Sequence, residues 1–160
     1  MSPGGLILYE GFLYLGSTVD VLKVPGATNT YATGINSAGE IVGRWDNGTR
    51  TSGFIYKNGV YTIINVPGST STILQAINDL GQIVGTYSDT SNITHTFIYE
   101  NGNYDEITAL LGGQVFLGPQ VRKGEVRGIN KSGQIVGWTS YNCASSCAFV
   151  ADPVGKLKTH

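Results

Sequence analysis

Two cysteines near the end of the chain, Cys143 and Cys147, are separated by only three residues. In an exported protein this spacing favours a local disulfide bond, with free thiols as the next interpretation. A metal site is the least favoured, because zinc patterns need further Cys or His ligands and the chain has only two histidines, His95 and His160. A catalytic cysteine would need a base beside it, which this spacing does not supply. We predict no metal or other cofactor.

Charge is concentrated in the segment 114–125, where Arg122, Lys123 and Glu125 lie within four positions. A charged loop placed over a rigid sheet is a common way to form a binding surface. A solvated hairpin extension is the favoured interpretation, because charged loop tips are ordinarily just exposed to solvent. The three residues are retained as candidates for ligand binding.

Three aromatic residues that follow Ile-Val-Gly sequences are candidates for carbohydrate recognition. Trp45 and Tyr87 occupy the same position after that sequence, and Trp138 lies one position earlier. Exposed aromatic rings can stack on sugars, because they present apolar area with a polar tip. Packing between sheets is favoured over this role, since large aromatic side chains are highly buried on average. Arg44, next to Trp45, is a further candidate for ligand binding.

Acid–base catalysis needs two positioned carboxyl groups, or a histidine with a partner. The chain has eleven Asp and Glu, and none recurs in the repeat described below, where Gln82 and Gln134 take the position of Glu40. One asymmetric site assembled from Glu40, Asp46, Arg44 or the segment 114–125 stays open. Because the sequence specifies no catalytic set, we lean towards a protein that is not an enzyme.

These candidates are positioned by a repeat of about forty residues that occurs three times. Its first marker, Gly/Ala-Ile-Asn-x-x-Gly-x-Ile-Val-Gly, lies at 34–43, 76–85 and 128–137. Its second marker is a Phe followed by an apolar residue, at Phe12, Phe54, Phe97 and Phe149. A third marker, Val-Pro-Gly, lies at 24–26 and 66–68. Chance similarity does not explain three markers in one register, and 114–125 is the largest break in the pattern.

The spacing of these markers predicts four short strands in each repeat unit. In the second unit they are 53–56, 61–66, 73–78 and 82–87. The sequence Asn78-Asp79-Leu80-Gly81 predicts a hairpin turn, since Asn bonds to nearby backbone and Gly adopts a left-handed conformation. The Ile-Val pairs should face the neighbouring sheets on both sides.

Four strands per period of about 40 residues are typical of a propeller blade. We therefore predict an all-β fold, a β-propeller-like array of four-stranded antiparallel blades, with about three to three and a half blades per chain. The chain forms a single repeat domain, 1–160. Its units are approximately 12–53, 54–96 and 97–148, followed by a partial unit at 149–160.

The half blade predicts an incomplete ring, because counting strand pairs from Phe12 gives seven. Unpaired sheet edges and an exposed apolar face both favour association. Closure could use Leu6–Tyr9 as an extra strand in an unusually small ring within one chain. Alternatively, a homo-oligomer could close the propeller, since two copies supply fourteen strand pairs, enough for seven blades.

The repeat resembles that of the bacterial HAF-type repeat proteins, which share a Gly-Ile-Asn-x-x-Gly-x-Ile/Val-Val-Gly core followed by a Phe-Leu/Ile-Tyr strand. The resemblance covers the chain from about Gly11 onward, and 107–113 is similar to the family's Leu-Gly-Thr-Leu-Gly-Gly stretch. The tripeptide that names the family is kept only in part, so His95 is a poor candidate for a functional residue common to the family. The resemblance implies a bacterial, frequently exported protein with a propeller-like fold, and no particular activity.

Composition argues against several classes of function. The net charge is −1 and the ten Lys and Arg are scattered, so we predict no nucleic-acid partner. The absence of a run of about 18 apolar residues predicts no membrane span. The segment 1–10 lacks the basic start and cleavage site of a signal peptide, although an export signal could have been trimmed.

The favoured functional prediction is a binding or interaction module, secreted or associated with the bacterial cell envelope, whose partner is carbohydrate or protein. One alternative is a small hydrolase or lyase acting on a polysaccharide or another exported substrate, with its site near 114–125. The other is a structural fragment of a longer repeat array.

Overall fold

The computed structural model describes residues 8–107, 109–111, 114–117, 124–139 and 147–151. Within these ranges the chain forms antiparallel strands joined by turns and contains no helix, and so no helical segment that could cross a bilayer. The predicted all-β class with four-stranded antiparallel sheets is confirmed.

Two of the sheets have four strands each, hydrogen-bonded in chain order. The first consists of β3 (Asn29–Ile35), β4 (Ile41–Asp46), β5 (Thr51–Lys57) and β6 (Val60–Ile64). The second consists of β7 (Ser71–Ile77), β8 (Ile83–Ser88), β9 (Thr94–Glu100) and β10 (Asn103–Glu106). Their registers are the same, including a bulge at the same place in β3 and β7.

Smaller sheets lie on either side of these two along the chain. A two-stranded sheet precedes them, formed by β1 (Gly11–Tyr14) and β2 (Val19–Leu22). After them come the hairpin of β11 (Ala109–Leu111) and β12 (Gln114–Leu117), and a three-stranded sheet of β13 (Gly124–Ile129), β14 (Ile135–Thr139) and β15 (Cys147–Ala151).

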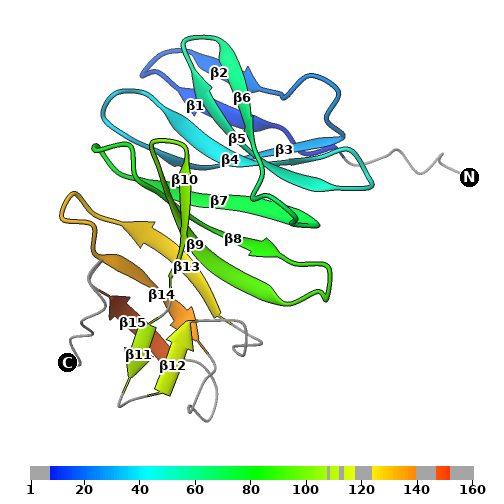
Figure 1. Ribbon diagram of the computed structural model, residues 1–160. Coiled ribbons are helices and arrows are strands. Elements are labelled where there is room, and N and C mark those ends of the chain that lie inside the picture. The colour runs from blue at the N-terminus through cyan, green and yellow to red at the C-terminus, as the bar shows by residue number, and fades with distance from the viewer. Residues whose placement is uncertain (1–7, 108, 112–113, 118–123, 140–146, 152–160) are drawn as a thin grey trace, which may run out of the picture.

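The main sheets stack face to face in the order of the sequence (Figure 1). The first strand of each full sheet contacts the first strand of the next, so that β7 touches β3 on one side and β13 on the other. The β1–β2 sheet lies against the opposite face of the first full sheet. Over the described ranges these sheets do not close into a ring, and the propeller stays a prediction.

Each hydrogen-bonded sheet is shifted by two strands from the repeat unit that the sequence predicts. The unit 54–96 begins at the Phe strand, whereas the corresponding sheet begins at β7. The strands predicted at 53–56 and 61–66 belong to one sheet, and those at 73–78 and 82–87 belong to the next. The boundary falls at Val-Pro-Gly, where Pro67 has no N–H for a ladder and the backbone N–H of Val66 donates to Thr72 Oγ1 instead.

The Ile-Val pairs of β4 and β8 are buried between sheets, as predicted, whereas in the pair of β14 Ile135 is buried and Val136 is 44% exposed. Ile41 packs with Leu22 and Phe54 against the β1–β2 sheet, whereas Val42 packs with Ile77 from the next sheet. Adjacent residues in a strand point to opposite faces, so one pair supplies both layers. The core is therefore a series of layers, each built from the same repeat positions.

The predicted Asn-x-x-Gly turns also form. The Oδ1 atom of Asn78 accepts the backbone N–H groups of Leu80 and Gln82, and Gly81 has a φ of 79°. The Nδ2 atom of the same residue donates to the backbone oxygen of Asn130 in the following sheet. Turn formation and sheet stacking are therefore coupled through one side chain.

Candidate functional site

The aromatic candidates lie on three different sheets, at β4, β8 and β14. Trp45 is half-buried and packs against the Leu22 cluster, and its buried Nε1 atom has no hydrogen-bond partner among the described residues. Tyr87 packs against the core cluster that contains Phe97. Trp138 is half-buried opposite Glu125 and Ala148. The structure does not bring the three rings together into one platform.

The charged candidates are distributed in a similar way. The guanidinium carbon of Arg44 lies 4.5 Å from the centre of the Tyr31 ring, a cation–π arrangement. Glu125, on β13, forms an ion pair with Arg127 at 2.6 Å. Arg122 and Lys123 lie outside the described residues.

The remaining sequence candidates give no shared centre either. Glu40 pairs with Lys57 at 2.7 Å, and this bond, together with one from Asn36, lowers the pKa of the Glu40 carboxyl. Cys143 lies outside the described residues, and only the backbone of Cys147 is described, in β15. The described part of the chain holds no cluster of three or more His, Cys, Asp or Glu side chains suited to a metal.

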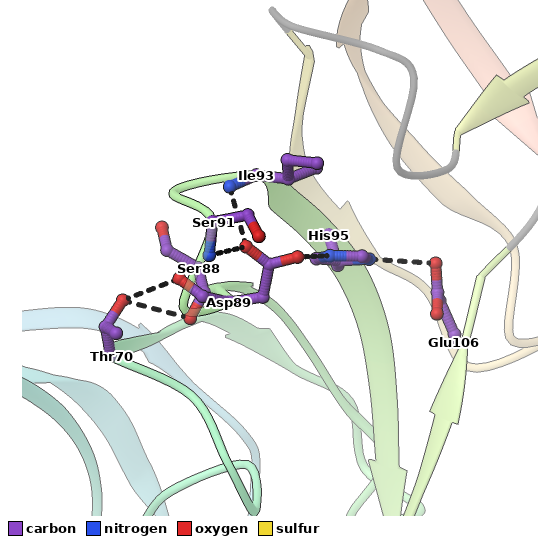
Figure 2. Close-up of polar contacts among 7 residues, drawn as sticks. All are labelled: Thr70, Ser88, Asp89, Ser91, Ile93, His95 and Glu106. Carbon is purple, nitrogen blue, oxygen red and sulfur yellow. Dashed lines mark hydrogen bonds and ion pairs between the residues drawn. The ribbon is translucent and has the colours of Figure 1, made fainter.

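A polar cluster that sequence reasoning did not select surrounds His95 on β9 (Figure 2). Its Nδ1 atom lies 3.1 Å from Glu106 Oε1 and its Nε2 atom lies 3.1 Å from Asp89 Oδ2. The other carboxylate oxygen of Asp89 accepts the backbone N–H groups of Ser91 and Ile93. The imidazole therefore joins the 89–93 loop to β10.

The charges of this cluster favour a protonated imidazole. Burial alone lowers the pKa of His95, but its hydrogen bonds to Glu106 and Asp89 and their negative charges outweigh burial and raise it. The N–H of Ile93, followed by the bond to His95, lowers the pKa of Asp89. Because a carboxylate occupies each ring nitrogen, neither is free to take a proton from a substrate. The arrangement suits a structural clamp better than a general base.

An apolar groove lies beside β1, on the face of β3 that no full sheet covers. Its volume is about 370 Å³, and it is lined by residues 12–14 of β1, residues 32–35 of β3 and Ile41. Among the lining residues, Ile35 is 53% exposed, whereas its repeat equivalent Ile77 is 8% exposed. Ile77 is covered because Val42 of the preceding sheet packs on it.

The wall of the groove is an open strand edge. Within the described ranges β1 pairs with β2 alone, whereas its repeat equivalents β5 and β9 are paired on both edges. The missing neighbour corresponds to β4 or β8, the strands that contain Ile-Val-Gly. By comparison with β5 and β9, the neighbour that β1 lacks in the described ranges is an Ile-Val-Gly strand.

The exposure of the marker phenylalanines differs according to whether this neighbouring strand is present. Phe54 and Phe97 are 0% and 1% exposed, whereas Phe12 is 69% exposed. Each buried ring lies across a glycine of the adjoining strand, since a Cβ added at Gly43 or Gly85 would lie 2.8 or 2.9 Å from it. Among the described residues, no such strand lies beside Phe12.

Comparison of the chain with protein-family models, with curated proteins and with solved structures found no match.

Proposed function

We propose that the chain is a non-catalytic interaction module that binds a β-hairpin of another protein in the groove between β1 and β3. The observation that supports this most directly is the exposure of Phe12, beside an open strand edge, at a position where the equivalent rings of Phe54 and Phe97 are buried. An extended segment can bind such an edge by adding a strand, with backbone hydrogen bonds giving affinity and side-chain contacts giving specificity.

The groove favours one kind of ligand strand. Beside β1 the ligand needs a glycine, because Gly43 and Gly85 occupy that position beside Phe54 and Phe97. Over Ile35 it needs a small branched apolar residue, because Val42 is the residue that covers Ile77. A ligand containing apolar-Val-Gly meets both requirements, and burying one such side chain stabilises a complex by about 1.5–3 kcal/mol.

A protein ligand has more support than a carbohydrate. Trp45 and Tyr87 have their rings packed in the core clusters, which leaves little free face for a sugar. The hydrolase or lyase alternative has less support again, since both ring nitrogens of His95 are engaged by the carboxylates of Glu106 and Asp89. The groove, by contrast, is open and apolar.

We also propose that the sheets belong to a β-propeller-like array in a secreted or envelope-associated bacterial protein. Face-to-face stacking of four-stranded sheets in chain order supports the array. The resemblance to HAF-type repeats supports the location.

Titration with a synthetic hairpin tests the binding function. The probe is a peptide of residues 76–88, which contains Ile83-Val84-Gly85, added to labelled protein at nanomolar concentration and followed by thermophoresis. We expect saturable binding that weakens at least tenfold when the peptide has Val84→Asp, because a carboxylate would then lie against the apolar floor.

Protein variants locate the binding site in the same titration. Ile35→Asp should abolish binding, and its exposed position should let the variant fold. Val60→Asp is the matched control, since Val60 is 63% exposed on β6 and lies outside the groove. Absence of binding by the unmodified protein, or equal binding by Ile35→Asp, would refute the proposed function.

A further inference from the structure

We infer that the partner is a second copy of this chain, and that the β13–β14 hairpin of each copy fills the β1–β3 groove of the other. This inference rests on the proposed function, because it uses the same groove. It adds the identity of the ligand, the strand that donates it and the assembly that results.

The last sheet has an uncovered face that matches the groove. Val42 and Val84 are fully buried by the sheets that follow them, whereas Val136, the equivalent residue of β14, is 44% exposed. Val42 packs with Ile77 inside the molecule. The equivalent pair, Val136 and Ile35, is left exposed at the two ends of the stack. The chain therefore presents both halves of a contact that it already forms internally.

The asparagine turns extend the same complementarity to hydrogen bonds. Asn36 Nδ2 donates to the backbone oxygen of Asn78 at 3.2 Å, and Asn78 Nδ2 donates to that of Asn130 at 3.0 Å. In the part of the chain that the structure describes, Asn130 Nδ2 donates only to Gln134 of its own turn. The backbone oxygen of Asn36 likewise accepts only from Gly39 of its own turn. Within the described residues, Asn130 Nδ2 can therefore donate one more hydrogen bond, and the backbone oxygen of Asn36 can accept one more.

In the dimer, the glycine that lies beside Phe12 of one copy would be Gly137 on β14 of the other copy. Gly137 is the equivalent of Gly43 and Gly85, and in the single chain it pairs with Phe149 of β15. β14 is thus paired on both edges, so joining β1 of the second copy requires β15 to leave. The residue after the Phe marker pair is Tyr in β1, β5 and β9 but Ala151 in β15, so β1 is the closer match to the repeat.

In this arrangement the two-stranded β1–β2 sheet of each copy becomes a four-stranded sheet. Each copy keeps its two four-stranded sheets, and β13–β14 of one copy joins β1–β2 of the other to give a third. Phe12 then faces the β7–β10 sheet of the other copy, as Phe97 faces the sheet that precedes its own. Two copies give six sheets related by a twofold axis, within the range of about 4–8 blades that propellers use.

A closed ring within one chain would have too few sheets for a propeller. Joining β13–β14 to β1–β2 of the same copy would give three sheets, fewer than the smallest propellers contain. The structure also keeps β1 and β14 in separate sheets. A second copy supplies the hairpin without that restriction.

The assembly is tested by light scattering on the full chain over a range of concentrations. We expect a dimer that dissociates on dilution. The dimer has two junctions, each formed by the groove of one copy and the β13–β14 hairpin of the other. Phe12→Asp alters the groove side of both junctions and Val136→Asp alters the hairpin side of both, so each variant should be monomeric. Val60→Asp should leave the dimer intact. All three side chains are exposed in the single chain, so the variants should fold, and circular dichroism checks this.

Mixing the two monomeric variants provides a sharper test. Phe12→Asp retains an intact Val136 hairpin, and Val136→Asp retains an intact groove, so the mixture should form a heterodimer with one junction. Native mass spectrometry of differentially labelled chains detects it. Neither variant alone should dimerise.

The outcomes separate this inference from the proposed function. If the 76–88 peptide binds but the unmodified chain stays monomeric at high concentration, the second-copy inference is wrong and the binding function stands. If neither peptide nor second copy binds, both are wrong. A dimer that persists in Phe12→Asp or Val136→Asp, or a variant mixture that fails to form the heterodimer, would refute the exchanged arrangement.

Discussion

The imidazole of His95 lies flat on the phenol ring of Tyr87, with ring centroids 4.6 Å apart and ring planes inclined by 7°. Tyr87 was a candidate for sugar stacking, but this face of its ring is covered by the histidine. The carboxylates of Asp89 and Glu106 hold the imidazole in place from its two edges. The stacking and the two bonds together fix the loop after β8.

The first prediction concerns pH. The pKa of His95 is raised above its ordinary value of 6.5, so its contribution to stability is fully present below that value and is lost as pH rises through the folded-state pKa. His95→Gln should therefore lower Tm by about 2–4 °C near pH 5.5, which corresponds to roughly 1 kcal/mol, and by less near pH 9. Thermal unfolding of both proteins across this range measures the difference.

The stabilising contribution of Asp89 changes with pH in the opposite direction from that of His95. The pKa of Asp89 is lowered from 3.8, so its contribution is present above that value and is lost as pH falls through the folded-state pKa. His95→Gln with an unchanged Tm difference at all pH values would contradict a charged clamp.

The second prediction concerns the glycine beside each marker phenylalanine. Gly43→Ala would place a Cβ against the backbone oxygen of Tyr31 and 2.8 Å from the ring of Phe54, which is fully buried. We expect a loss of about 3 kcal/mol in the free energy of unfolding, because overpacked cores have no room to relax. Gly48→Ala is the control: its Cβ meets nothing within 4 Å, and its φ of 86° adds only backbone strain of about 1 kcal/mol. Urea unfolding compares the two, and equal losses would contradict the packing argument.

The third prediction concerns the asparagine turns. Asn78→Ala removes three bonds within its own turn and one to Asn130 of the next sheet, so we expect a loss of about 2–3 kcal/mol. Asn130→Ala should cost roughly 1 kcal/mol, since its side chain is exposed and bonds only within its turn. Both are measured by urea unfolding in the monomeric Val136→Asp background. A larger loss from Asn130→Ala would contradict the coupling between turns and stacking.

Local features of this fold were predictable from the sequence because they depend on residues close together in the chain. The strands, the Asn78 turn and the two-faced role of Ile41 and Val42 all follow from short spacings. The grouping of strands into sheets was not predictable in the same way, because a repeat has no intrinsic starting point. Only the Val-Pro-Gly segment, with a proline that cannot join a ladder, marks the boundary between sheets.

The polar cluster and the groove depend on contacts that repeat comparison does not show. His95 departs from the repeat, and its partners Asp89 and Glu106 are brought to it by the antiparallel pairing of β9 and β10 and by a loop. The groove arises from what is missing beside β1, and Phe12 looks identical in sequence to the buried Phe54. Exposure of the side chain at an equivalent position is the signal that distinguishes them, and it depends on the tertiary structure.

The last prediction concerns Trp45, whose Nε1 atom is buried and finds no acceptor among the described residues. A buried donor without a partner costs about 1–3 kcal/mol. Trp45→Phe keeps an aromatic ring in the Leu22 cluster and removes the donor, at the expense of some packing. The two effects oppose each other, so we expect Tm to stay within about 2 °C of that of the unmodified protein, whereas Trp45→Ala should lower it by 8 °C or more, on the order of 3–5 kcal/mol. If Trp45 instead served to bind sugar, Trp45→Phe would abolish binding on a glycan array while both variants kept their Tm.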